Sequence, residues 1–146
     1  MMEQIVDRDI LDLSEYAMSL SIKHVEKAKE FFRSEGYPIP IGFKDNDYTP
    51  NSPQLFYDVF CLNYLNIMSL HCCHGYSGAI TTSSRLDVRN YFTECLASSV
   101  ELCNRTKNVL QEKGLFHRPP NITPPERAEY VVDNNFLVDG LERQEL

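Results

Sequence analysis

The stretch from Pro53 to Ser84 constrains the fold most, because Asp58 is its only formally charged residue. Its large apolar side chains do not keep to one narrow stripe but surround most of a helix: Leu55, Phe56, Val59, Phe60, Leu62, Tyr64, Leu65, Ile67, Met68 and Leu70. A helix that is apolar all round belongs in an interior, and ten such groups at roughly 2 kcal/mol each give on the order of 20 kcal/mol of burial. The stretch therefore predicts a central helix that other segments cover.

A membrane-spanning segment is the main alternative for this stretch. Two asparagines and two histidines, Asn63, Asn66, His71 and His74, interrupt its apolar run. The run is then shorter than the ~20 apolar residues that a bilayer requires, so we expect no membrane span.

Length and charge indicate one acidic domain over residues 1–146. The net charge of −7 argues against nucleic acid or an anionic membrane surface as a partner. The first residues, MMEQIVDRDILDLSEY, are acidic and do not predict a signal peptide. The five cysteines, an odd number within helical patterns, suggest unpaired thiols that pack in a core. These features together predict a cytoplasmic protein.

Apolar residues at three- and four-residue spacing predict the first long helix, over about residues 7–36. Asp7 or Asp9 can cap its start, and Gly36 ends it. Its buried stripe holds Ile10, Leu13, Ala17, Leu20, His24, Ala28 and Phe31.

Two further long helices are expected over residues 53–82 and 84–114. The central helix would begin with Pro53 at its first helical position, after a serine N-cap. The third would begin at an S-x-x-D capping box, residues 84–87, and end at Gly114. Because the link between them is short, they should be antiparallel neighbours.

Proline-rich segments connect these helices, and a T-x-x-E box from Thr123 predicts a short last helix over residues 124–134. We expect the first connection, residues 37–52, to lie on the helices, because it carries several apolar side chains. The predicted fold is all-α: an up-and-down bundle of three long helices with proline-rich straps and a short C-terminal helix.

Three histidines are candidate ligand-binding residues. His71 and His74 share a helix face with Cys72 and Cys73 between them, and His24 lies on the buried stripe of the first helix. Zinc requires four converging ligands from at least two segments, and the two cysteines point away from the histidines. A hydrogen-bonded core histidine is the favoured interpretation of His24, and no metal or other cofactor is predicted.

Four sequence strings resemble the signatures of an uncharacterised family of endospore-forming bacteria. They are PIPIGF at 38–43, LFYD at 55–58, SRLDV at 84–88 and KGLFHRPPNITPP at 113–125. The resemblance, from about Asp7 to Arg143, is to a domain of unknown function similar to spore coat protein F. It implies a ferritin-like four-helix bundle and spore association, and no catalytic residues. Family members usually begin with one more long helix, which this chain lacks.

Ferritin-like di-iron sites require inward glutamates and Glu-x-x-His pairs. The sequence contains no Glu-x-x-His, and Asp58 is the only candidate inner carboxylate. The iron chemistry of that fold is therefore not expected here.

Two classes of function follow from these features. The first is a non-enzymatic structural or interaction protein that resembles spore-coat bundles. It would form a homodimer or other oligomer through the apolar groove around the central helix, or bind another spore or coat protein. The second is a metal- or small-ligand-binding bundle that uses His24, His71 and His74. Convergence of the three imidazoles on one centre would favour the second.

Asp58 is predicted to be a structural anchor. It faces the end of the bundle where the third helix stops, which makes Arg118 the preferred cation, with Arg33, Arg105 and Lys113 as alternatives. A carboxylate among aromatic side chains needs such a partner, and arginine can bind it through two parallel N–H bonds.

Overall fold

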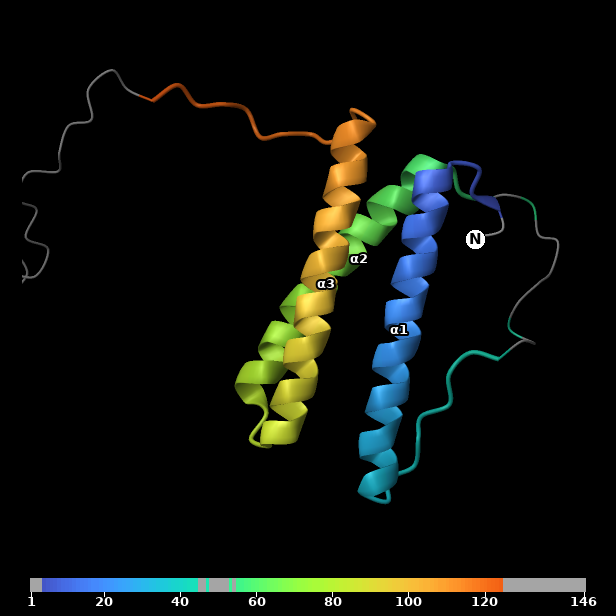
Figure 1. The fold of residues 1–146 in the computed structure, drawn as a ribbon, viewed down its shortest axis with the longest axis vertical. Helices are drawn as coiled ribbons and strands as arrows, with labels where there is room; N and C mark the ends of the chain where they lie inside the picture. The colour runs from blue at the N-terminus through green and yellow to red at the C-terminus, as the bar shows by residue number, and fades with distance from the viewer. Residues whose placement is uncertain (1–3, 45–46, 48–52, 54, 125–146) are drawn as a thin grey trace, which may run out of the picture. The chain divides into compact units, whose positions relative to one another are not determined.

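The structure is a computed structural model that describes residues 4–44, 47, 53 and 55–124. The chain divides into two compact units, Met1–Phe116 and His117–Leu146. The first unit contains three long α-helices: α1 (Arg8–Ser34), α2 (Asp58–Thr82) and α3 (Leu86–Glu112) (Figure 1). The predicted all-α fold with three long helices is confirmed.

The described part of the second unit, residues 117–124, has neither helix nor strand. The short helix predicted over residues 124–134 lies, except for its first residue, outside the described residues.

The helices pack unequally. α2 and α3 run antiparallel and contact each other over most of their length, whereas α1 contacts both less extensively (Figure 1). The core lies where α1 and α2 begin and α3 ends, and its buried members are Ile5, Ile10, Leu13, Cys61, Leu62 and Leu110. All buried residues of α1 belong to its first half.

The ends of α1 and α3 follow the sequence signals. The Asp7 side chain caps α1 by accepting the backbone N–H groups of Asp9 and Ile10 at 3.1 and 3.4 Å. Gly36 and Gly114 follow the last residues of α1 and α3 with φ angles of 70° and 68°. Glycine adopts this left-handed conformation without a Cβ penalty, and for that reason both helices stop there.

α2 begins five residues later than predicted, at Asp58, and Pro53 lies outside the helix. Its first carbonyl acceptor is that of Tyr57, which receives the N–H groups of Phe60 and Cys61. The predicted start of the helix rested only on the local signals of a serine N-cap followed by Pro53. In the structure the Asp58 carboxylate binds the start of α1 and thereby fixes where α2 begins.

α3 also begins without the predicted capping box. Its N-cap is Arg85, and no side chain caps the helix. The Asp87 carboxylate instead accepts two bonds from the Arg85 guanidinium, at 3.1 and 2.7 Å. Arg85 also binds Glu35 at the end of α1 at 2.6 Å, so a distant partner holds the arginine over Asp87.

The prediction that other segments cover the central helix all round is wrong for the described residues. α2 buries Cys61, Leu62 and Ser69 against its neighbours. Its opposite side exposes large apolar residues at 40–51%: Val59, Phe60, Tyr64, Ile67 and Met68. Phe56, just before the helix, is 43% exposed. Among the described helices, α1 and α3 contact α2, and α2 crosses behind α3 in Figure 1.

The described part of the segment after α1 carries two apolar side chains that do not pack on the helices. Ile41 and Phe43 are 85% and 99% exposed, so the predicted packing of this segment on the helices is absent for them. None of the described helices is long and apolar enough to cross a membrane. All five cysteines are free.

Candidate functional site

His24 joins all three helices through hydrogen bonds. From α1, its Nδ1 lies 3.2 Å from the Tyr76 hydroxyl on α2, and its Nε2 lies 2.9 Å from the Ser98 hydroxyl on α3. The Tyr91 hydroxyl of α3 donates to the His24 carbonyl at 2.9 Å. The predicted buried stripe of α1 places the histidine here, and α2 and α3 supply its partners.

The hydrogen-bond pattern favours a neutral imidazole. Ser98 Oγ donates to backbone carbonyls of its own helix, so it accepts the His24 Nε2–H. Nδ1 then accepts the Tyr76 hydroxyl proton. Burial, assisted by the nearby Lys23 charge, lowers the pKa of His24, which agrees with the neutral form.

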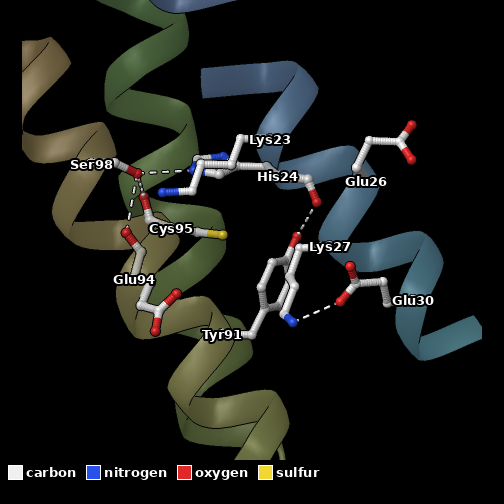
Figure 2. Close-up of a pocket in the computed structure, with 9 residues that line it drawn as sticks. All are labelled: Lys23, His24, Glu26, Lys27, Glu30, Tyr91, Glu94, Cys95 and Ser98. Carbon is white, nitrogen blue, oxygen red and sulfur yellow. Dashed lines mark hydrogen bonds and ion pairs between the residues drawn. The ribbon is translucent and has the colours of Figure 1, made fainter. Parts of the chain in front are cut away.

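Two cavities meet at His24. The larger, about 430 Å³, opens between α1 and α3 and has Tyr91, Cys95 and Ser98 on the α3 side (Figure 2). Its α1 side carries charged residues, of which Lys27 and Glu30 pair at 2.7 Å. A smaller cavity of about 210 Å³ lies among residues of all three helices: Ala17, Leu20, Ser21, His24, Val25, Cys72, Tyr76, Ser99 and Leu102.

The groups around His24 are suited to packing rather than to catalysis. Cys95 is 1% exposed, and burial raises the pKa of its thiol, which keeps it protonated near neutral pH. Burial also raises the pKa of Tyr76 to about 12. Neither side chain is activated as a nucleophile or base, and the hydroxyls hold the imidazole in place.

His71 and His74 lie elsewhere. Both are exposed on α2 and line neither cavity. Within the described part of the chain, no group of three or more histidine, cysteine, aspartate or glutamate side chains is placed to hold a metal ion.

Asp58 anchors the beginning of α1. Its Oδ2 accepts the backbone N–H groups of Val6 at 3.1 Å and Asp7 at 2.7 Å. Arg118 belongs to the second unit, and its pairing with Asp58 stays a prediction.

The other cations considered for Asp58 include two with partners elsewhere. Lys113, beyond the end of α3, pairs with Asp7 at 2.7 Å and with Asp9 at 3.0 Å. Arg105 pairs with Glu101 and lies over the Tyr16 ring, 4.0 Å from its centroid. Lys113 therefore fixes the end of α3 to the start of α1, close to the Asp58 contact.

The exposed side of α2 carries a row of stacked rings. Phe56 and Phe60 stack with centroids 4.6 Å apart, and Phe60 and Tyr64 with centroids 6.3 Å apart. Residues four apart share a helix face, and Ile67 continues the row. The exposed α2 face (Phe60, Tyr64 and Ile67, with Phe56 just before the helix) lies opposite the buried Leu62 and Ser69. These residues belong to the apolar run of the sequence, which was predicted to be covered by other segments.

The fold and these features define an all-helical protein with a hydrogen-bonded histidine at the centre and an exposed aromatic helix face. The chain belongs to the family described as "Protein of unknown function (DUF3231)", which matches residues 1–127.

The fold is similar to the crystal structure of a Bacillus halodurans C-125 protein described as a "putative spore coat protein". The TM-score is 0.74 at 19% sequence identity, over 84% of this chain and 80% of the other. No curated protein matches the chain.

Proposed function

We propose that this protein is a non-enzymatic structural or interaction protein that self-associates through the exposed α2 face. The single observation that carries the proposal is the row of half-exposed rings on α2. Such a row costs free energy in water, and exposed apolar patches of this kind mark interaction sites.

The size of the face supports association. Large side chains that are about half exposed leave on the order of 500 Å² of apolar surface there, near the upper end for a monomer. Two copies would bury about 1,000 Å², the lower limit for a specific interface. We therefore expect a dimer of moderate affinity.

The setting we propose is the cytoplasm of an endospore-forming cell, in association with the spore or its coat. The similarity in fold to a protein described as a spore coat protein supports this setting. We further propose a ferritin-like bundle in which one side of α2 is left for another copy or a coat protein.

Light scattering on the purified protein, with two matched variants, tests self-association. Ile67→Glu places a charge on the exposed α2 face and should convert the dimer to a monomer. Val100→Glu changes a similarly exposed residue on α3, 44% against 51%, and should leave the dimer intact. A wild-type monomer at high micromolar concentration, with helix content retained, would contradict the proposal.

Spore association is tested separately. A fluorescent fusion in a sporulating host should collect at the forming spore, and Ile67→Glu should disperse it. A uniformly distributed wild-type fusion would contradict this part of the proposal.

A further inference from the structure

We propose that the smaller cavity at His24 binds a small uncharged aromatic molecule with one hydroxyl group, of the size of phenol. The cavity has a volume of about 210 Å³ and lies among residues of all three helices. The proposal goes beyond self-association and does not rest on it, because no residue of the exposed α2 face lines the cavity. It comes from the character of the cavity walls and from one hydroxyl group in them.

The walls of the cavity are mainly apolar and carry no formal charge. Aliphatic side chains line it from α1 and α3, among them Ala17, Leu20 and Leu102. No lysine, arginine, aspartate or glutamate is among the described residues that line it. The hydrogen bonds of His24 favour the neutral imidazole. A charged ligand would lose its hydration here without compensation, so the walls favour an uncharged one.

Ser99 supplies the hydroxyl group that would recognise the ligand. Two other buried serines, Ser14 and Ser69, donate to a carbonyl of their own helix at 2.7 and 2.8 Å. Ser99 is 4% exposed, yet its hydroxyl has no hydrogen-bond partner among the described residues. Within the described part of the chain every fully enclosed side-chain oxygen has a partner, so the Ser99 oxygen is reached from the cavity that it lines. A buried hydroxyl without a partner costs free energy, which a ligand hydroxyl would recover.

The size of the cavity and its neighbours favour a single aromatic ring. An apolar cavity of about 150 Å³ is sufficient to bind benzene, so this larger one accommodates a ring with a substituent. Tyr76 lines the cavity and packs edge-on against His24, with ring centroids 5.7 Å apart. A ligand ring beside Tyr76 would extend this aromatic contact. Val25, also in the wall, is 52% exposed, so the cavity reaches the surface there and a ligand can enter.

Methyl NMR spectroscopy of the full-length protein, titrated with phenol and with benzene, tests the proposal. Both compounds should shift the methyl signals of Leu20 and Leu102, and phenol should bind roughly fivefold more tightly because of one net hydrogen bond. Ser99→Ala should reduce this preference to about one while benzene still binds. Ser69→Ala removes a buried serine hydroxyl outside the cavity and should preserve the preference.

A filled cavity and charged ligands supply the second measurement. Ala17→Leu places a larger side chain in the cavity and should abolish the binding of both compounds. Ala97→Leu makes the same change at an exposed position of α3 and should not affect binding. Benzoate and benzylammonium should each bind roughly tenfold more weakly than phenol, because no charged group in the walls compensates their lost hydration. Circular dichroism verifies that each variant is folded.

Several results would overturn the proposal. The first is a folded protein in which neither compound shifts the signals of Leu20 and Leu102, or in which the shifts are confined to Ile67 and its neighbours. The second is a preference for phenol that Ser99→Ala leaves unchanged, and this comparison decides even if Ala17→Leu fails to fold. The third is benzoate binding more tightly than phenol, which would assign the ligand to the larger cavity with Lys23. A monomeric wild-type protein would contradict self-association and leave this inference standing.

Discussion

The Asp58 carboxylate accepts the backbone N–H of Asp7 at 2.7 Å and thereby joins the start of α2 to the start of α1. The same oxygen accepts the N–H of Val6. These bonds cross more than 50 residues of sequence, so Asp58 stabilises tertiary structure rather than its own helix alone.

Removal of this carboxylate should destabilise the protein. Asp58→Ala leaves two backbone donors without their acceptor, and we expect the free energy of unfolding to fall by about 1–2 kcal/mol. Asp58→Asn keeps an acceptor oxygen without its charge and should cost about half as much. Urea denaturation measures both. Asp12→Ala removes an exposed carboxylate paired with Arg8 and should change stability by about 0.5 kcal/mol or less. An Asp58→Ala transition equal to that of Asp12→Ala would show that the anchor contributes nothing.

The predicted pairing of Asp58 with Arg118 requires a double-mutant cycle. If the two side chains interact, the combined effect of Asp58→Ala and Arg118→Ala should differ from the sum of the single effects by on the order of 1 kcal/mol. Additive effects would restrict Asp58 to its backbone contacts. Denaturation of the wild type, both single variants and the double variant gives the coupling directly.

The contact between Lys113 and Asp7 should make stability depend on acid pH. The hydrogen bond from Lys113 lowers the pKa of Asp7 below its ordinary 3.8 in the folded protein. A lowered carboxyl pKa gives stability that is present above 3.8 and is lost as pH falls through the folded value. Lys113→Gln should therefore reduce the acid dependence of the unfolding midpoint below about pH 4, most clearly at low salt. Lys107→Gln makes the same charge change on α3 and should retain the wild-type slope.

His24 should give a second pH dependence, at higher pH. Because burial lowers the pKa of His24, the unfolded chain takes up a proton first as pH falls below 6.5. Stability should be complete above 6.5 and decline as pH falls towards the lower folded value. His24→Gln should flatten this part of the profile, measured by urea denaturation from pH 7.5 to 5. His71→Gln, at an exposed position on α2, should preserve it, and an unchanged profile in His24→Gln would show that the imidazole is solvated in both states.

The protein should purify without a stoichiometric transition metal. The described histidines and cysteines do not assemble into a group of three ligands, and one buried or exposed imidazole alone holds zinc or iron weakly. Elemental analysis of protein prepared without chelator is the measurement. About one zinc or iron per chain would contradict the expectation and revive the ligand-binding hypothesis for His24, His71 and His74.

Spacing in the sequence was sufficient to predict the three helices, because the buried stripes of α1 and α3 each span about six turns and the apolar run of α2 spans more than about four. Gly36 and Gly114 correctly predicted the ends of α1 and α3, because the left-handed conformation of the residue after a helix depends on the local backbone alone. The start of α2 was not predictable in the same way. It depends on a contact between Asp58 and the backbone of Asp7, which only the folded chain brings together.

The candidate site depended still more on tertiary structure. His24 was identifiable from its place on an apolar stripe, but Tyr76 and Ser98 carry no sequence signal as its partners. The exposure of Phe60 could not be predicted from the sequence either, because burial depends on how many helices surround α2 and not on the composition of α2 itself.

The concentration of buried residues in the first half of α1 has a consequence for local unfolding. Beyond Ala17 this helix is held by the hydrogen bonds of His24, by the Phe31–Tyr91 ring contact and by the Glu35–Arg85 pair. Polar contacts beside two cavities hold a helix less firmly than a packed core. The second half of α1 should therefore open before α2 and α3 separate, and its amide protons should exchange with solvent ahead of those in the α2–α3 hairpin.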